Sequence, residues 1–453
     1  MTGIMKLAGK DLNLPEKRQE YNVCVVGCGR TGLVTACLFV EAGFKVIGVD
    51  SSSHIVHQLK KGISPFTENN LRKIIEKNIK NSQFKATTNT RTAVSESDVI
   101  IMAVPSALDQ RKKPDYSRLE KTCRDIGMSL KSGSLIIFQN NIAPGITQTL
   151  AKDALENASG LKTGTDFGLA YCSTLNGSMN SSLNIYNSKK VIGGITKRSL
   201  RITGLLFSTI TKGEIIRVKD IKTAEAVKLL EEAYKDINIA FANEFAQFCE
   251  KAGIDFVKVR NIINPIKCSG MAGLHSSKDS YVLVEEADSL NVKLRMLSLS
   301  TKINDETLDH AIRLIRDALR CSQKNLRRAK ISVFGISALV NRKKVSNSAA
   351  KKLVLELKKR GVLVKVYDPL FSHKELSNMG YETETSMSKT VEGADCLVVA
   401  VAHDRFERLN LNRLQMLMKQ PAALVDMGQV IDPIKAEKAG FVYRGFGRGI
   451  WTR

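Results

Sequence analysis

The stretch Asn22-Val23-Cys24-Val25-Val26-Gly27-Cys28-Gly29-Arg30-Thr31-Gly32 decides the fold of this 453-residue chain. The five residues before the glycines predict a short buried strand, and the small and apolar residues up to Ala42 predict a helix that Gly43 ends. In a G-x-G-x-x-G sequence the first two glycines let the backbone turn tightly and approach a pyrophosphate, and the third lets helix and strand pack closely. The helix N-terminus adds free N–H groups and a positive dipole end. The stretch therefore predicts a site for the phosphates of a dinucleotide.

A second strand, expected from Phe44 to Val49, ends at Asp50, eighteen residues after Gly32. A carboxylate at this position accepts hydrogen bonds from ribose hydroxyls and repels a 2′-phosphate, so the sequence favours NAD over NADP. The alternative is a glycine turn in an α/β domain that binds no ligand. The complete order of strand, glycines, helix and acid favours the NAD site.

The alternation of strand and helix continues along the chain, with strands expected at Asp98–Val104 and Ser134–Phe138. A long amphipathic helix, expected over Thr223–Glu250, interrupts it, and a mostly helical stretch follows to about Arg328. A second alternating region has strands expected at Ile331–Gly335, Val362–Asp368, Ala394–Ala402 and Ala422–Asp426 and a helix at Ser348–Arg360. Such alternation indicates a parallel sheet with helices on both faces.

The predicted fold class is therefore α/β, with two doubly wound, Rossmann-like domains joined by a long central helix and a helical middle domain. We expect a loose polar tail at residues 1–20, an NAD-binding domain at 21–220, a central helical domain at 221–328 and a C-terminal α/β domain at 329–453. The second α/β region contains Gly335 but no glycine triplet like the first. A second dinucleotide bound in the same way is therefore not expected.

Composition narrows the classes of partner. The chain has 69 Lys and Arg against 45 Asp and Glu, a net charge of +24, which suits anionic ligands. Nucleic acid is not expected, because only the charge points to it and no run of five Lys or Arg occurs. No apolar run is long enough to predict a membrane span. Nine cysteines without C-x-x-C pairs indicate reduced thiols of a cytoplasmic protein, and no metal site is expected.

From about residue 21 to Gly449 the sequence resembles the UDP-glucose and UDP-N-acetylmannosamine 6-dehydrogenases. The motifs that carry the resemblance are Gly27–Leu33, Val104-Pro105-Ser106 with Pro114-Asp115, Pro144-Gly145, Val191–Gly194, Lys228-Leu229, Asn238–Glu244, Gly253–Asp255, Ile303–Asp305, Tyr367–Pro369 and Gly445-x-Gly447-x-Gly449. The resemblance implies NAD-dependent oxidation of a UDP-sugar for polysaccharide biosynthesis. It also implies a dimer through the long helix, either a homodimer or a heterodimer with a paralogue. Cofactor contacts are expected from Gly27, Gly29, Arg30, Thr31, Gly32, Asp50, Val104, Pro105 and Ser106.

The long helix of such enzymes carries a lysine and an asparagine that stabilise the developing oxyanion. Lys228 occupies the lysine position, but Glu232 stands where the asparagine belongs, and a carboxylate cannot donate a hydrogen bond to an oxyanion. The alternative interpretation of this pair is a solvated helix face with an i,i+4 ion pair. The Pro-Glu-Arg region reads Tyr171–Leu175 and has no carboxylate, and the Ser-Thr pair before the Pro-Gly turn reads Asn140-Asn141.

Enzymes of this family oxidise a sugar hydroxyl to a carboxylate with two NAD and a cysteine that forms a thioester. The glycine-rich loop that carries this cysteine reads Gly270–Asp279 here, and alignment places His275 or Ser276 at the cysteine position. Neither is a thiol, and we do not expect the upstream Cys268 to replace it. His275 is the candidate base. The other candidates are Lys228 and Asp279 for catalysis and Lys228 and Gly273 for substrate binding.

In the C-terminal domain the family's Asp-Asp-x-Arg-x-Ser run becomes Lys343–Ser348. Lys343 and Lys344 are candidates for holding a diphosphate as point charges, and the alternative is a basic surface loop. Two hypotheses follow for the whole chain. It is an NAD-dependent nucleotide-sugar dehydrogenase limited to two-electron oxidation by the missing cysteine, or it is a non-catalytic paralogue that binds a nucleotide or nucleotide sugar and pairs with an active dehydrogenase.

Overall fold

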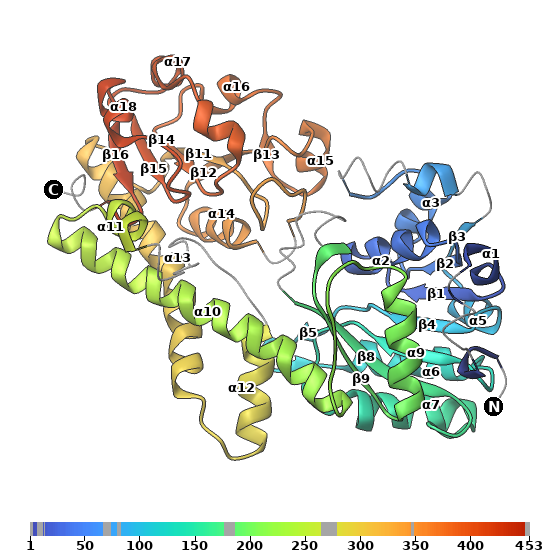
Figure 1. Ribbon diagram of the computed structural model, residues 1–453. Helices are drawn as coiled ribbons and strands as arrows, with labels where there is room; N and C mark the ends of the chain where they lie inside the picture. The colour runs from blue at the N-terminus through green and yellow to red at the C-terminus, as the bar shows by residue number, and fades with distance from the viewer. Residues whose placement is uncertain are drawn as a thin grey trace. The chain divides into compact units, whose positions relative to one another are not determined.

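The computed structural model describes residues 3–6, 12, 14–66, 74–78, 83–175, 186–263, 279–345 and 348–448 (Figure 1). It forms two compact units. The first contains Met1–Glu232 and Tyr281–Lys293, and the second contains Ala233–Ser280 and Leu294–Arg453. The helices between the two sheets are divided between these units, and the bounds of three separate domains stay a prediction.

The first unit contains a sheet in the order β10-β9-β8-β7-β4-β1-β2-β3. Its strands are β1 Asn22–Val26, β2 Lys45–Val49, β3 Phe84–Thr87, β4 Val99–Met102, β7 Leu135–Phe138, β8 Gly168–Thr174, β9 Lys190–Gly194 and β10 Ile215–Arg217. From β3 to β8 all neighbours are parallel, and β9 runs antiparallel to β8. The parallel part has the strand order 3-2-1-4-5-6, which is that of a dinucleotide-binding fold.

Apolar side chains cover both faces of this sheet. One core cluster joins the strands to α2 and α9, and another joins them to α5, α6 and α7. The helices are η1 Gly3–Lys6, α1 Pro15–Arg18, α2 Arg30–Glu41, α3 Ser53–Lys60, α5 Thr90–Ser95, α6 Ser117–Gly127, η3 Thr147–Ala151, α7 Lys152–Ser159 and α9 Lys197–Ser208, and a short ribbon pairs β5 Ala107–Leu108 with β6 Pro114–Asp115.

The start of the chain differs from the expected loose tail. Ile4 and Met5 are fully buried and Leu12 is nearly so, all in the core cluster that contains α2. Met5 packs so closely on β8 that a Cβ at Gly168 would lie 2.7 Å from its sulfur. A loose tail was therefore the wrong expectation for these three residues, because their apolar side chains pack into the core although the segment around them is polar.

The second unit contains a six-stranded, entirely parallel sheet in the order β13-β12-β11-β14-β15-β16, which is again 3-2-1-4-5-6. The strands are β11 Lys330–Phe334, β12 Leu363–Tyr367, β13 Glu382–Thr383, β14 Cys396–Val399, β15 Ala423–Asp426 and β16 Val442–Gly445. The helices are α11 Phe256–Ile263, α13 Arg295–Cys321, α14 Ala349–Lys359, α15 His373–Asn378, α16 Met387–Val391, η5 Asp404–Arg408, α17 Leu411–Leu417 and α18 Pro433–Lys438. The predicted fold class is confirmed.

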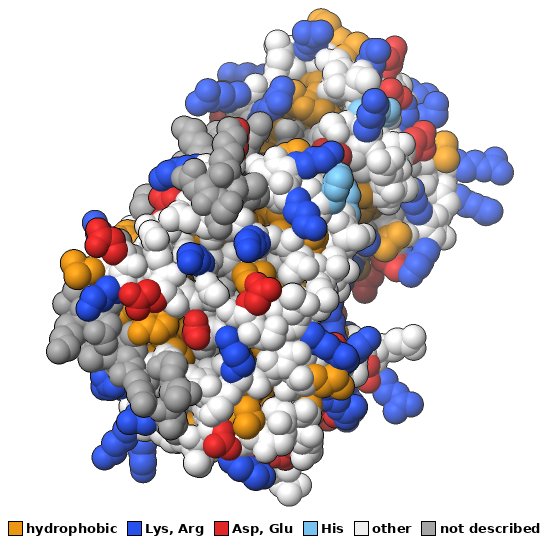
Figure 2. Space-filling view, turned by 90° about the vertical axis from the view of Figure 1, so that its right-hand side faces the viewer, with side chains coloured by type: hydrophobic (Ala, Val, Ile, Leu, Met, Phe, Trp, Pro, Cys, Tyr) orange, Lys and Arg blue, Asp and Glu red, His pale blue; other side chains and the backbone are white. Residues whose placement is uncertain are grey.

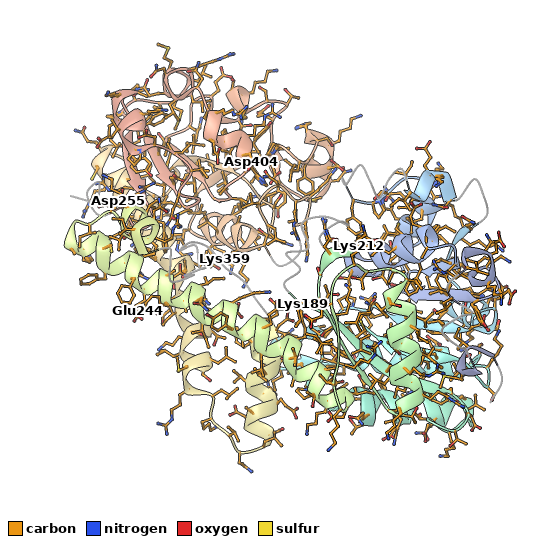
Figure 3. The ribbon with its side chains drawn as sticks, in the orientation of Figure 1. Lys189, Lys212, Glu244, Asp255, Lys359 and Asp404 are labelled. Carbon is orange, nitrogen blue, oxygen red and sulfur yellow. The ribbon has the colours of Figure 1, made fainter. Side chains whose placement is uncertain are left out.

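Gly447 and Arg448, at the end of the described part of the second unit, are held by buried charged side chains. Arg448 forms an ion pair with both carboxylate oxygens of Asp255, which lie 2.9 and 2.8 Å from its Nη1 (Asp255 is labelled in Figure 3). Gly447 donates its backbone N–H to Glu250, and the Glu250 carboxylate also pairs with His310 at 2.9 Å. The glycine-rich end of the chain is thereby bound to the helices of its own unit.

The long helix α10, Ile221–Ala252, passes from the first unit into the second, and α12, Asp279–Ser289, follows later in the chain. On α10 the side chains of Tyr234, Phe241, Phe245 and Phe248 are exposed, and the rings of Phe241 and Phe245 lie 4.5 Å apart. Among the described residues these rings are therefore not buried by intramolecular packing. A second chain over this helix stays a prediction.

None of the described helices is both long and apolar enough to cross a membrane. On the face drawn in Figure 2, lysine and arginine side chains are spread over the surface among a smaller number of acids. The positive charge on this face is therefore distributed and does not gather into a single patch.

Candidate functional site

The glycine loop between β1 and α2 has the geometry that a dinucleotide needs. Gly27 has φ +100°, and a Cβ there would lie 2.8 Å from the carbonyl oxygen of Ala103. A Cβ on Gly32 would lie 1.9 Å from the Gly27 carbonyl, so helix and strand touch at this point. A Cβ on Gly29, by contrast, would meet nothing within 4 Å. The second glycine therefore faces open space, as expected where a pyrophosphate approaches the backbone.

The residues around the loop suit the other parts of the cofactor. Helix α2 begins at Arg30 and no side chain caps it, so its dipole end is available to phosphate. Thr31 lies in the same first turn, and the Arg30 guanidinium lies 5.1 Å from the centre of the Phe66 ring. Asp50 at the end of β2 is only partly buried and accepts hydrogen bonds from the backbone N–H of Cys28 and Ser52 at 3.0 and 2.9 Å. Its carboxylate is thus fixed at the place where the ribose is expected.

Val104, Pro105 and Ser106 follow β4 at the same edge of the sheet. Val104 and Ser106 are buried and Pro105 is exposed. The Ser106 hydroxyl donates to the carbonyl of Asn141 at 2.8 Å and so connects the loop after β4 to the loop after β7. Both loops lie at the carboxyl ends of the strands, where doubly wound folds bind their ligands.

A buried carboxylate that the sequence analysis missed fixes the turn after β7. Glu225, on the first turns of α10, is fully buried and accepts the backbone N–H groups of Gly145 and Thr147. Burial raises the pKa of Glu225, and these hydrogen bonds oppose that effect. The Tyr116 hydroxyl accepts the N–H of Ala143 at 3.0 Å, and burial raises the pKa of Tyr116 to about 12. The signal in the sequence is a glutamate one helical turn before Lys228.

Lys228 is held by two carboxylates of its own helix. Its Nζ lies 2.9 Å from Glu231 and 2.6 Å from Glu232, and its side chain is 13 % exposed. Burial alone lowers the pKa of Lys228, but the carboxylates of Glu232 and Glu231 outweigh it, and the pKa lies above its ordinary value. The i,i+4 ion pair is therefore present on a half-buried face, and Glu231 adds a second partner. The charge of Lys228 is already largely compensated.

The remaining catalytic candidates lie at the start of α12 or outside the described residues. His275 and Gly273, with Ser276 and Cys268, lie outside the described residues. Asp279 is the first residue of α12 and is partly buried. The catalytic roles of His275 and Asp279 and the substrate contact of Gly273 stay predictions.

The described cysteines lie mostly in the cores. Seven of them are buried, and only Cys321 among those described is exposed. Burial raises the pKa of Cys24, Cys123 and Cys172 to about 12 and also raises that of Cys28, Cys249 and Cys396. A thiol with a raised pKa is a poor nucleophile, because the thiolate is the reactive form.

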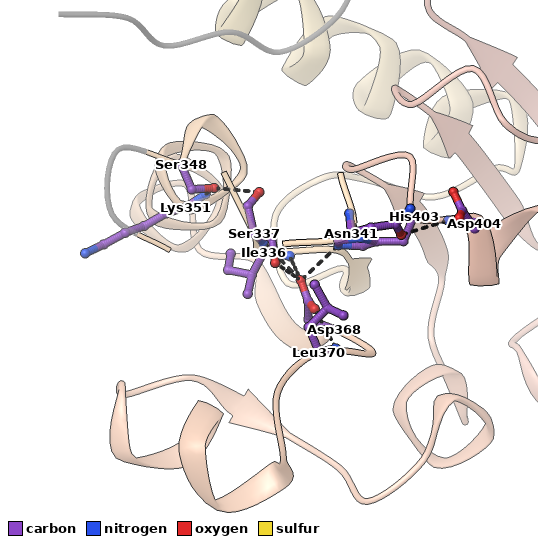
Figure 4. Close-up of polar contacts among 9 residues, drawn as sticks. All are labelled: Ile336, Ser337, Asn341, Ser348, Lys351, Asp368, Leu370, His403 and Asp404. Atoms are coloured by element: carbon purple, nitrogen blue, oxygen red, sulfur yellow. Dashed lines mark hydrogen bonds and ion pairs between the residues drawn. The ribbon is translucent and has the colours of Figure 1, made fainter. Parts of the chain in front are cut away.

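The second sheet uses the corresponding acid differently (Figure 4). Asp368 follows β12 as Asp50 follows β2, but it is fully buried. One of its oxygens accepts the N–H of Ile336 at 2.8 Å, the N–H and hydroxyl of Ser337 at 3.0 and 2.8 Å, and Nε2–H of His403 at 3.3 Å. Burial by itself raises the pKa of Asp368, but the hydrogen bonds that it accepts from His403, Leu370 and Ile336 bring it below its ordinary value. This acid is not available to a ribose.

His403 extends the same network to the loop after β11. Its Nδ1 accepts the backbone N–H of Asn341 at 2.8 Å, so the proton that reaches Asp368 is on Nε2. Asn341 in turn accepts the N–H of Asp404 at 3.2 Å. The loop is thus fixed by hydrogen bonds within the protein, and the expectation that no second dinucleotide binds in the manner of the first stays a prediction.

Lys343 and Lys344 lie in this loop. Lys343 Nζ is 2.5 Å from a carboxylate oxygen of Glu375 and 5.3 Å from the centre of the Phe371 ring. The Lys344 carbonyl accepts the N–H of Ala338 at 2.6 Å, which closes the loop. To hold a diphosphate, Lys343 would have to release the Glu375 carboxylate, so this role stays a prediction.

Comparison with known proteins matches three consecutive regions to one family. Residues 21–211 match the NAD binding domain of the UDP-glucose/GDP-mannose dehydrogenase family, 222–306 its central domain and 332–433 its UDP binding domain. The chain belongs to this family. Its cofactor is NAD, and the open space at Gly29, the uncapped α2 and the position of Asp50 fit that cofactor.

Relatives of this UDP-glucose/GDP-mannose dehydrogenase family member align over nearly their whole length. The UDP-N-acetyl-D-mannosamine dehydrogenase of Methanocaldococcus jannaschii is 30 % identical over 94 % of this chain and 96 % of its own. That of Pyrococcus horikoshii is 29 % identical over 94 % and 99 %. The solved structure of the Pyrococcus horikoshii enzyme has a TM-score of 0.84, with 26 % identity over 95 % of this chain and 100 % of its own.

One buried acid of this family member gives a pH-dependent prediction. Asp426, at the end of β15, is fully buried and accepts the N–H of Ile431 at 2.7 Å, and burial raises its pKa to about 6. Because this folded-state pKa lies above the unfolded value, ionisation of Asp426 opposes folding as pH rises from about 4 to 6. Asp426→Asn keeps the acceptor oxygen and removes the charge. Its stability relative to the wild type is therefore expected to increase from pH 4 to pH 7 and to be constant above. Urea unfolding of both proteins at each pH measures this, and a pH-independent difference contradicts it.

Proposed function

We propose that this chain uses NAD to oxidise a hydroxyl of a UDP-sugar by two electrons and stops at the carbonyl stage. The supporting observation is the loss of the cysteine from the glycine-rich loop. The run Gly270–Asp279, which holds the cysteine in similar enzymes, contains none. Among the described cysteines, all but Cys321 are buried. Without a thiol in this loop no thioester forms there, and the second oxidation has no covalent intermediate to act on.

The proposed reaction separates into a proton transfer and a hydride transfer. NAD supplies the hydride acceptor when it is bound. His275 is the proposed base that takes the hydroxyl proton. Lys228 is the proposed stabiliser of the alkoxide. Glu231 and Glu232 already compensate the charge of Lys228. We therefore propose that the Lys228 ammonium breaks its ion pair with at least one of these carboxylates before it stabilises the alkoxide. The relatives' names make UDP-N-acetylmannosamine the first substrate to test.

The ratio of NADH formed to sugar consumed tests the proposal. We expect one NADH per sugar and a carbonyl product that hydroxylamine traps, identified by mass spectrometry. His275→Ala is expected to abolish this turnover while NAD binding is retained, and the exposed His373→Ala is its matched control.

Two other outcomes contradict the proposal in different ways. Two NADH per sugar together with a uronic acid would show that the chain completes the four-electron oxidation. If NAD binds but no nucleotide sugar gives NADH, even when hydroxylamine is present to trap a carbonyl product, the result would favour the non-catalytic paralogue.

A further inference from the structure

The outer face of α14, in the second unit, is rich in lysine (Figure 1). On the inner side of this helix, apolar residues are buried in the core of the second sheet, namely Ala350, Leu353, Val354 and Leu357. The outer side carries exposed residues at the spacing of one helix face, namely Lys351, Lys352, Leu355, Lys358 and Lys359 (Lys359 is labelled in Figure 3). One exposed leucine thus lies within one helical turn of four lysines.

The positive charge continues beyond the end of α14. Arg328 donates its backbone N–H to the carbonyl of Gly361 at 2.9 Å, and a Cβ on Gly361 would lie 3.7 Å from Cγ of Arg327. Both arginines are exposed. At the border of the helix face the carboxylate of Glu356 pairs with Lys359 at 2.7 Å and so compensates only part of the charge. We call the two arginines and the five outer residues of the helix the α14 surface.

Two of the lysines lie where the helix dipole disfavours them. Lys351 and Lys352 belong to the first turn of α14, which contains no acidic residue. The N-terminal end of a helix dipole is positive and favours carboxylates, whereas lysines stabilise the C-terminal end. The dipole therefore accounts for Lys358 and Lys359 in the last turn, but not for the first two. Lysines at the start of a helix become favourable when an anion lies opposite them, which indicates an anionic partner outside the chain.

Leu355 distinguishes between the classes of anionic partner. Its side chain is 48 % exposed and lies among the lysines. An anionic bilayer presents phosphate groups above a hydrocarbon layer, so lysines contact the head groups while an apolar side chain enters the layer below. Nucleic acid presents phosphates without such a layer, and stacking on its bases uses aromatic side chains, which the seven residues of the α14 surface do not include. The α14 surface therefore suits a lipid surface better than a nucleic acid.

We propose that the α14 surface docks this protein on a bilayer that contains anionic phospholipids. The contact is peripheral, because the lysines and arginines pair with lipid phosphates and Leu355 enters between the head groups while the inner side of α14 stays in the core. Salt screens exposed charges beyond about 8 Å at physiological ionic strength, so docking weakens as salt is added. The proposal is independent of the reaction proposed above. It gives a role to a part of the +24 net charge that the NAD site does not account for.

Sedimentation with lipid vesicles tests the proposal. We expect the wild type to bind vesicles of phosphatidylglycerol mixed with phosphatidylcholine and not vesicles of phosphatidylcholine alone. A lysine near an anionic membrane contributes about fivefold to the affinity, so Lys351→Glu with Lys352→Glu is expected to weaken binding at least about 25-fold. Leu355→Ser is expected to weaken binding without a change in charge. A thermal melt is expected to show that the double variant is at least as stable as the wild type, because two acids replace two lysines at the start of the helix.

Lys435→Glu with Lys438→Glu, at exposed positions of α18, changes the net charge by the same amount and is the matched control. It is expected to retain most of the binding. An equal loss in both double variants would overturn the proposal, because only the overall charge would then matter. Failure of the wild type to bind the anionic vesicles would also overturn it.

Two competition experiments at constant ionic strength exclude other roles of the α14 surface. Displacement of the protein from the vesicles by UDP would assign the lysines to a nucleotide-sugar site and contradict docking. Binding of a DNA duplex more tightly than the vesicles, with the same loss in Lys351→Glu with Lys352→Glu, would assign the surface to nucleic acid. If that double variant does not fold, Leu355→Ser and Lys358→Gln with Lys359→Gln decide the question, and unchanged vesicle binding in both overturns the proposal.

Discussion

Replacing Gly29 by alanine is expected to weaken NAD binding at least about tenfold, or about 1.4 kcal/mol, while the stability of the protein changes little. Gly29 has φ −64°, which alanine adopts freely, and its Cβ would meet no protein atom within 4 Å. The fold therefore has room for the methyl group. The methyl group would, however, occupy the space that the pyrophosphate needs to approach the backbone N–H groups. Titration with NAD and a thermal melt of the same sample measure the two effects.

Gly32→Ala is the contrasting variant for this experiment. Its Cβ would lie 1.9 Å from the Gly27 carbonyl oxygen, so helix and strand must move apart and stability is expected to fall. If Gly29→Ala binds NAD as tightly as the wild type does, the cofactor does not approach this part of the loop. A fall in the melting temperature of Gly29→Ala equal to that of Gly32→Ala would show that the space is not open.

Replacing Arg448 by methionine is expected to destabilise the second unit by about 3–5 kcal/mol. Arg448 and Asp255 are both buried, and the substitution leaves the Asp255 carboxylate in the protein without its counter-ion. The double variant Arg448→Met with Asp255→Asn removes both charges and is expected to recover most of this loss. Asparagine retains the side-chain oxygen that accepts the N–H of Val257 at the start of α11. Urea unfolding of the wild type, the single variant and the double variant measures the coupling.

The ion pair between Lys113 and Glu285 is the matched control, because both side chains are largely exposed. Solvent screens such a pair, so Lys113→Met is expected to have little effect on stability. A similar loss for Lys113→Met and Arg448→Met would contradict the argument, since burial would then make no difference. A double variant that is no more stable than Arg448→Met would show that packing of the arginine side chain, and not its charge, holds the end of the chain.

The sequence predicted the dinucleotide site well because its parts are close together along the chain. Strand, glycines, helix and Asp50 occupy about thirty consecutive residues, and each has a position fixed by local geometry. Four strands of each sheet were predicted because they are short, mostly buried apolar runs: β1, β2, β4 and β7 in the first and β11, β12, β14 and β15 in the second. The strands β3, β8, β9, β10, β13 and β16 were not predicted. The burial of Ile4 and Met5 was not predicted, because it depends on a core that the rest of the first unit forms.

The catalytic region was predicted less completely for a different reason. The sequence showed Glu232 as the partner of Lys228, but the contribution of Glu231 depends on side-chain placement within one helical turn. Asn140 was recognised only as a departure from the family pattern. The structure shows that its amide is buried without a hydrogen-bond partner among the described residues. Patterns in sequence indicate which groups are present, whereas hydrogen-bond satisfaction depends on contacts between distant segments.

The two acids that end the second strand of each sheet have different thermodynamic consequences. Asp368 receives its hydrogen bonds from the chain itself, so the loop after β11 loses its conformational entropy when the protein folds. Asp50 accepts two backbone N–H groups and stays partly exposed. The exposed part of the Asp50 carboxylate must therefore lose water before it accepts a ribose hydroxyl, and this desolvation cost is subtracted from the affinity for the ligand. One topology thus directs the acid into the protein in one unit and leaves it partly open to solvent in the other.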